Sequence, residues 1–140
     1  MHCSRPTTWM AFDFGLKRIG VAFGNGLTRT AQPVCVVQAG SDTQRFEQIE
    51  KLVKEWQPEG FVVGVPCHDD GQPHEITRLC QRFARQLTGR FGLQSVTVDE
   101  RFTSVVAQVG LTGKTRADRK RETDMRSACL ILEQYFLEGR

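Results

Sequence analysis

The sequence lacks the features of membrane proteins and of disulfide-bonded secreted domains. None of its apolar runs approaches the roughly 18 residues that are needed to cross a bilayer, and residues 1–6 contain no hydrophobic region of a secretory signal. Its cysteines are odd in number and form no Cys-x-x-Cys pair, which argues against a disulfide framework and against zinc. We therefore expect a cytoplasmic protein with free thiols that does not bind membranes.

The chain also lacks internal repeats, low-complexity tracts and any linker that would divide it. Its 140 residues suffice for one hydrophobic core but not for two large lobes. Apolar residues make up 39% of the chain and charged residues 25%, as in ordinary globular proteins. We expect a single domain over residues 1–140, with a short N-terminal extension at residues 1–7.

The order of the apolar segments predicts a mixed α/β sheet. Five short runs have the composition of strands, namely Trp9–Phe14, Ile19–Gly24, Pro33–Val37, Phe61–Val65 and Ser95–Asp99. Helical spacing follows the capping sequence Ser41–Gln44, recurs between Ile76 and Leu87, and returns after Asp124. Thr103 and Ser104 are expected to cap a further short helix. The order βββ-α-β-α-β-α-α predicts a mixed sheet with helices on both faces.

Carboxylates stand at three places that this topology can bring together. Asp13 ends the first apolar strand, Asp99 and Glu100 end the last strand, and Asp124 is expected to open the final helix. Sites in open α/β sheets form beyond the strand ends. At an effective dielectric constant of about 20, two such charges roughly 4 Å apart repel by about 4 kcal/mol. Hard cations such as Mg²⁺ or Mn²⁺ would relieve this repulsion, and two of them would suit phosphoryl displacement.

Each acid taken alone also has an ordinary explanation. Asp13 precedes a glycine and could be a turn residue. Either Asp99 or Glu100 could be a strand-terminal acid with Arg101 as its ion partner, and Asp124 could be a first-turn acid favoured by the helix dipole. The functional interpretation therefore depends on the acids acting together.

Positive charge is concentrated in one part of the chain. Residues 101–126 contain seven cations and three acids, a net charge of +4 that leaves −1 for the remainder of a chain whose total is +3. Residues 110–122 hold most of these cations and have no apolar period, so we expect a mobile basic loop there. Such a segment suits contact with an anionic polymer, although a solvated surface loop would have the same composition.

Four motifs carry a resemblance to a known family: Asp13–Ala22, Val63–Pro66, Val98–Ser104, and Asp124 followed by an apolar helix that contains Leu130–Leu132. In order and spacing they resemble the YqgF/RuvX family, the Holliday-junction-resolvase-like and ribosomal-RNA-processing nucleases of the ribonuclease-H-like superfamily. The resemblance covers nearly the whole chain. It implies a five-stranded mixed sheet of order 3-2-1-4-5 with helices on both faces.

The resemblance also implies roles for individual residues. Asp13, Glu100 and Asp124 would be the catalytic, metal-binding acids. Neighbouring residues on a strand face opposite sides, so only one of Asp99 and Glu100 can readily reach the site, and the resemblance favours Glu100 with Asp99 as its substitute. Contacts to phosphate or nucleic acid are expected from Gly15, Arg18, Arg101, Thr103, Ser104, Lys114, Arg116, Arg119, Lys120, Arg121 and Arg126.

The activity implied is that of a cytoplasmic endonuclease that hydrolyses phosphodiesters with two Mg²⁺ or Mn²⁺ ions and no nucleotide cofactor. The precursor of 16S ribosomal RNA is the substrate that the resemblance favours, with the protein acting as a monomer or weak dimer. A Holliday-junction-resolvase-type nuclease acting on branched DNA stays open. A non-catalytic RNA-binding ribosome assembly factor is a further alternative, although binding a polyanion gains nothing from three converging carboxylates.

Three other interpretations fit less well. Actin-like ATPases and sugar kinases share the Asp-x-Gly turn but need two lobes, and this chain provides one. Gly110–Thr115 resembles a P-loop, but Gln108 stands where that pattern needs glycine. His68 and His74 flank two aspartates without established ligand spacing, so they are expected to be loop residues.

Overall fold

The computed structural model describes residues 7–38, 40–66, 75–100 and 110–138, and for Pro66 and Glu100 it describes the backbone only. Its strands are β1 (Thr8–Asp13), β2 (Arg18–Asn25), β3 (Thr30–Gln38), β4 (Gly60–Pro66) and β5 (Gln94–Glu100). Its helices are α1 (Asp42–Trp56), α2 (Glu75–Phe91) and α4 (Arg116–Leu137). Within these parts of the chain, no helix combines the length and apolar character needed to cross a membrane.

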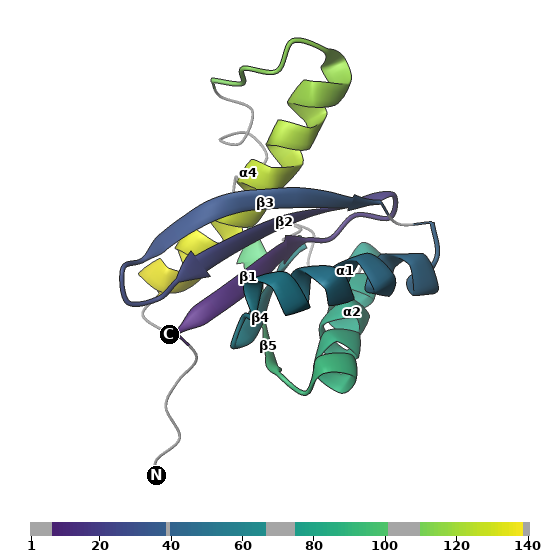
Figure 1. Ribbon diagram of the computed structural model, residues 1–140, viewed down its shortest axis with the longest axis vertical. Coiled ribbons are helices and arrows are strands. Elements are labelled where there is room, and N and C mark those ends of the chain that lie inside the picture. Colours follow the sequence, from purple (N-terminus) through teal and green to yellow (C-terminus); the bar gives the residue numbers. More distant parts are fainter. Residues whose placement is uncertain (1–6, 39, 67–74, 101–109, 139–140) are drawn as a thin grey trace.

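The five strands form one sheet of order β3-β2-β1-β4-β5. Strand β2 runs antiparallel to both β1 and β3, whereas β1, β4 and β5 are parallel to one another. Helices α1 and α2 cover one face and α4 covers the other (Figure 1). The predicted mixed sheet of order 3-2-1-4-5 is therefore confirmed, with β1 at its centre.

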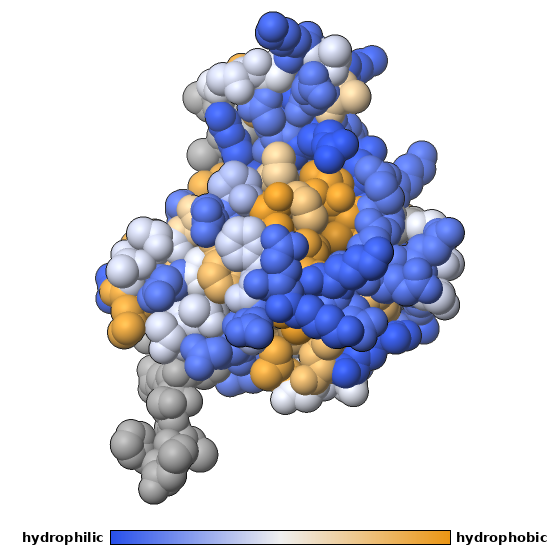
Figure 2. All heavy atoms as spheres, viewed as in Figure 1, coloured by the Kyte–Doolittle hydropathy of each residue, from blue (hydrophilic) through white to orange (hydrophobic). Residues whose placement is uncertain are grey.

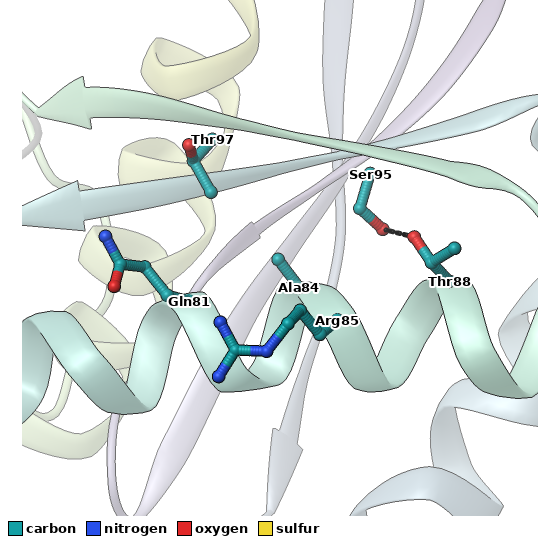
Figure 3. A pocket seen from close by; sticks show the side chains of 6 residues that line it. All are labelled: Gln81, Ala84, Arg85, Thr88, Ser95 and Thr97. Carbon is teal, nitrogen blue, oxygen red and sulfur yellow. Dashed lines mark hydrogen bonds between the residues drawn. The ribbon is translucent and has the colours of Figure 1, made fainter.

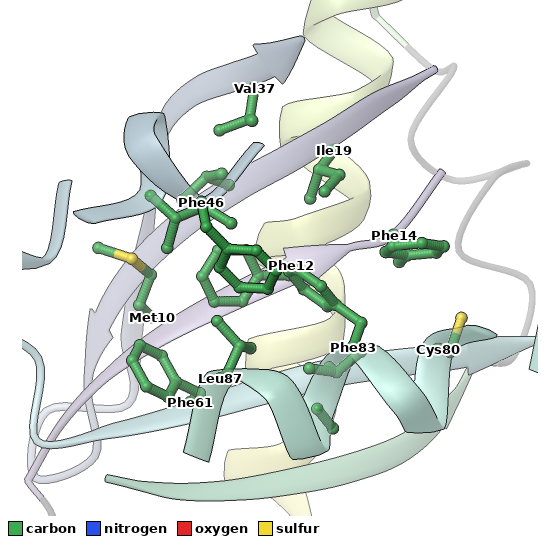
Figure 4. Close-up of a cluster of buried hydrophobic side chains, with 14 of the residues drawn as sticks. Met10, Phe12, Phe14, Ile19, Val37, Phe46, Phe61, Cys80, Phe83 and Leu87 are labelled. Atoms are coloured by element: carbon green, nitrogen blue, oxygen red, sulfur yellow. The ribbon is translucent and has the colours of Figure 1, made fainter. Parts of the chain in front are cut away.

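The face under α1 and α2 is built around aromatic side chains. Met10 and Phe12 point to this face from β1 and are fully buried. Phe12 packs edge-on against Phe83 of α2, with ring centroids 5.4 Å apart, and Phe61 of β4 lies 5.8 Å from Phe12 (Figure 4). Such rings supply much of the apolar area that stabilises a small domain.

The opposite face of the sheet is flatter and lets α4 approach closely. Trp9 and Ala11 alternate with the residues above and point to this face, where Ala22 of β2 and Ala128 of α4 also lie. Tyr135 of α4 meets Trp9 edge-on, with centroids 4.8 Å apart. Because alanines cover the middle of the contact, the helix backbone can come close to the strands.

Helix α4 begins earlier than the sequence predicted. The segment 110–122 is not a loop throughout, because Arg116 is the first residue of α4 and Asp124 lies in its third turn instead of opening it. The Thr115 hydroxyl caps the helix by accepting from the Asp118 amide at 3.0 Å. An apolar period is absent because these first turns project beyond the sheet and are exposed on all sides (Figure 1).

The non-helical part of this segment, residues 110–115, is tied to α4 by Glu122. The Glu122 carboxylate accepts from the Thr112 amide at 3.0 Å and from the Thr112 hydroxyl at 3.1 Å. The Thr112 amide is the main cause that lowers the pKa of Glu122 below its ordinary value of 4.5. The ionised carboxylate is therefore the form that holds the segment.

We predict that acid breaks the contact between Glu122 and Thr112. Because the folded protein lowers the pKa of Glu122, this contact is fully present above the ordinary value of 4.5 and is lost as the pH falls through the lowered pKa. The Thr112 amide shift, followed by NMR during acid titration, should report this loss. In Glu122→Gln the same amide should show no such transition, and an unchanged transition in that variant would contradict the assignment.

Candidate functional site

A pocket of about 550 Å³ opens where β1 ends. It is formed by the β1–β2 turn, the start of α2 and the second and third turns of α4. Its lining residues are Asp13, Phe14, Gly15, Leu16, Lys17, Arg18, Ile76, Lys120 and Asp124. Two of the three predicted acids, which lie near opposite ends of the sequence, thus line the same pocket together with three cations.

Gly20 is the residue through which the two acids are brought together. Asp13 and Gly20 are partners in the antiparallel register of β1 and β2, so both face the same side of the sheet. A Cβ atom at Gly20 would overlap the backbone carbonyl oxygen of Asp124. The absence of a side chain therefore lets α4 lie against β2 at Asp124, beside the position of Asp13.

The alternation of β1 places Asp13 on the same face as α4. Trp9 and Ala11 pack in the core under α4, and Asp13 continues this set two residues further on. Its register partner on the other side, in β4, is Gly64. Asp13 therefore has a glycine as its partner on each neighbouring strand, and the backbone of α4 lies directly over one of them, Gly20.

Arg18 connects the start of β2 to α4. Its Nε donates to the Asp124 Oδ2 at 2.9 Å, and the two side chains are 30% and 21% exposed. A partly exposed pair of this kind contributes about 1 kcal/mol or less to stability. Its larger effect is local, because it fixes the Asp124 carboxylate and places a positive charge beside the acids.

The turn between β1 and β2 is tight at Gly15. A Cβ atom there would overlap the Arg18 carbonyl oxygen, so a larger residue would force this turn open. Leu16 stands at its tip and is 62% exposed. Lys17 follows it on the pocket rim.

The last strand carries the remaining acids. Val96 and Val98 belong to the core under α4, whereas Ser95 and Thr97 line a groove with Gln81 and Arg85 of α2 (Figure 3). Alternation assigns Asp99 to the second set, on the side of α2.

The backbone of Glu100 lies at the edge of the sheet where β1 also ends. It pairs with Pro66 of β4, two residues beyond the level of Asp13 and Gly64. From ordinary strand spacing and rise, the Asp13 and Glu100 Cα atoms are about 12 Å apart. The Glu100 side chain is outside the described residues, and in the described part of the chain no group of three or more potential metal ligands occurs.

The predicted phosphate-binding cations separate into different environments. Lys120 lines the pocket. Arg119 donates to the carbonyl oxygens of Gly113 and Lys114, both at 3.3 Å, and Arg126 donates to that of Gly110 at 3.0 Å. These two arginines hold residues 110–114 against α4.

The structure gives less information on the other residues that were predicted to contact phosphate or nucleic acid. Arg116, Arg121 and Lys114 are exposed. Arg101, Thr103 and Ser104, together with His68 and the expected short helix, lie outside the described residues. Sequence reasoning gave no role to Gly20, Lys17 or Ile76. A glycine inside a strand often marks close backbone approach, so Gly20 carried a signal that could have been used.

These features define a class of protein: a ribonuclease-H-like α/β fold with acids at the end of its central strand. Solved structures share the fold. Thermus thermophilus RuvC bound to a Holliday junction aligns with a TM-score of 0.55 at 12% identity, covering 94% of each chain. The fowlpox virus Holliday junction resolvase gives 0.54 at 10% identity, covering 95% of this chain and 99% of that one. At such identity the likeness establishes the fold.

Residues 7–138 match the family model described as "RuvX: Holliday junction resolvase", and the chain belongs to this family. A protein of Paraburkholderia phymatum is 50% identical over 139 residues, covering 96% of this chain and 91% of its own length. One of Paraburkholderia phytofirmans is 51% identical over 137 residues, covering 97% and 92%. Both carry the name "Putative pre-16S rRNA nuclease".

We predict that Gly20→Ala separates the two acids. Its Cβ would meet the helix backbone at Asp124, which cannot rotate away as a side chain would, so α4 must shift and the protein should lose about 1–3 kcal/mol of stability. Denaturant unfolding measures this loss. Gly89→Ala is the matched control, because its Cβ meets nothing within 4 Å and should stabilise α2 slightly. Equal stability of the two variants would contradict this role for Gly20.

Proposed function

We propose that this protein is an endonuclease that hydrolyses phosphodiester bonds with divalent metal ions held by Asp13, Glu100 and Asp124. The observation that carries the proposal is the convergence of Asp13 and Asp124 on one pocket with cations at its rim. Family membership and the names of the relatives support the same class of activity.

The residues of the pocket fit Mg²⁺ or Mn²⁺. Carboxylate oxygens are the ligands that these hard ions prefer, and Asp13 and Asp124 both line the pocket of about 550 Å³. Bound ions of this kind supply an activated water and stabilise the leaving oxygen of an in-line displacement. Glu100 completes the set because it ends the strand next but one to β1, whereas the alternation of β5 assigns Asp99 to the side of α2.

The side chains around the acids would attract and orient the substrate. Lys17 and Lys120 bring positive charge to the pocket, which favours entry of a phosphate group. Arg18 holds Asp124 in place through its 2.9 Å ion pair, and the rigidity of the helix fixes the direction from which that acid approaches. Preorganised charge of this kind is a principal source of rate enhancement in phosphoryl transfer.

For the substrate we favour the precursor of 16S ribosomal RNA, processed in the cytoplasm. The support is the name shared by relatives that are about half identical over nearly the whole chain. Branched DNA is the second candidate, favoured by the family description and by the resolvases that share the fold. The acid cluster argues against a protein that only binds RNA, because carboxylates weaken binding to a polyanion in the absence of metal ions.

We predict that Asp13→Asn, Glu100→Gln and Asp124→Asn each reduce cleavage at least about 100-fold, because removing one metal ligand forfeits several kcal/mol of transition-state stabilisation. Cleavage of single-stranded precursor RNA and of four-way DNA junctions should be measured with Mg²⁺, with Mn²⁺ and without either.

Asp99→Asn is the matched control for Glu100→Gln and should retain most of the activity. Thermal unfolding of every variant separates loss of chemistry from loss of fold. Cleavage that survives all three substitutions would overturn the mechanism. Loss in Asp99→Asn with activity kept in Glu100→Gln would show that Asp99 is the ligand, and cleavage of the junction alone would reverse the choice of substrate.

A further inference from the structure

Two cations and one acid follow each other at intervals of four residues along α4: Arg116, Lys120 and Asp124. Residues four apart lie on neighbouring turns of the same helix face. Lys120 lines the same pocket as Asp124, and Arg116 is exposed one turn further from the sheet. We call Arg116 and Lys120 the basic row. We propose that the basic row binds two successive phosphates of a polynucleotide strand, next to the phosphate that is cleaved at Asp13 and Asp124. This inference rests on the proposed function.

The spacing of the basic row suits a strand that runs along the helix. With a rise of about 1.5 Å per residue, Lys120 lies about 6 Å and Arg116 about 12 Å along the axis from Asp124. One helical turn is comparable to the separation of adjacent phosphates in an extended strand. The first turns of α4 project from the body of the protein with a hydrophilic surface (Figures 1 and 2), so a strand can follow them without meeting the sheet.

The position of the basic row is unfavourable for the helix itself. The N-terminal end of a helix carries partial positive charge and favours acids over cations. Like charges at a spacing of four residues also repel each other. The first effect opposes Arg116, which lies in the first turn, and the second opposes the pair. Bound phosphates would offset both. A local conflict of this kind is expected at functional positions.

Neighbouring cations have other roles in the described structure. Arg119 and Arg126 donate to backbone carbonyl oxygens of residues 110–114. Arg121 lies toward β3, where its charge partly offsets the effect of burial that raises the pKa of Cys35. The lining of the pocket includes Lys120 but not Arg121. Arg121→Ala is therefore a control variant, because it removes the same positive charge at the position next to Lys120.

The first measurement is binding of single-stranded RNA and of single-stranded DNA without divalent metal, by fluorescence anisotropy over a range of salt concentrations. Arg116→Ala and Lys120→Ala should each weaken binding about 5- to 10-fold and reduce the salt slope by about 0.7. Arg121→Ala should change both much less. Thermal unfolding should show that neither basic-row variant is destabilised, since a cation has been removed from the helix N-terminus.

The second measurement assigns positions. RNA substrates carry a single uncharged methylphosphonate linkage at successive places around the cleavage site. An uncharged linkage at either of two adjacent positions on one side of the cleavage site should slow cleavage by the wild type. Cleavage by Lys120→Ala should be insensitive to the modification at the nearer position, and cleavage by Arg116→Ala should be insensitive to the modification at the farther position. Sensitivity that is the same in all variants would overturn the proposal, as would an Arg121→Ala variant that loses as much binding as Lys120→Ala. If wild type binds as expected but cleaves neither RNA nor four-way DNA junctions, the proposed function fails and the basic row stands as a binding element.

Discussion

The close approach of α4 to β2 at Gly20 is the contact on which the site depends. Because Gly20 has no side chain, the helix backbone at Asp124 rests directly on the strand that pairs with Asp13. Alanines extend the same contact along the helix, and Arg18 fixes the Asp124 carboxylate from the start of β2. A sheet–helix contact made by small residues therefore determines the position of two acids from distant parts of the chain.

The charges around this contact change from acidic at the end of β1 to basic along the first turns of α4. Acids meet at the end of β1, Arg18 and Lys17 stand beside them, and the cations of the first helical turns extend away from the sheet. Cations are unfavourable at the N-terminal end of a helix. Two contacts stabilise this end of α4: Thr115 caps it, and Glu122 accepts a hydrogen bond from the Thr112 amide. The fold thus places a basic element at a distance from its hydrophobic core.

Most of the fold follows from the apolar pattern. Continuous runs such as Phe61–Val65 mark strands buried on both faces, and the order of elements limits the sheet to few topologies. The start of α4 could not be predicted in this way, because Arg116–Arg121 is exposed all round and no apolar period marks it as helical. For the same reason Asp124 was assigned to a first turn when it lies in the third. The pairing of Arg18 with Asp124 depends on a tertiary contact, and the sequence supports only the weaker statement that Arg18 is near the acids.

The central claim is that Asp13 and Asp124 are ligands of the same metal site. Titration of the protein with Mn²⁺ by isothermal calorimetry, without any nucleic acid, tests it most directly. Wild type should bind Mn²⁺, and Asp13→Asn and Asp124→Asn should each weaken that binding. The double variant should bind Mn²⁺ only slightly more weakly than the single variant with the lower affinity, because ligands of one site are not independent. Mn²⁺ binding that is unchanged in both single variants, or losses that add fully in the double variant, would contradict a shared site.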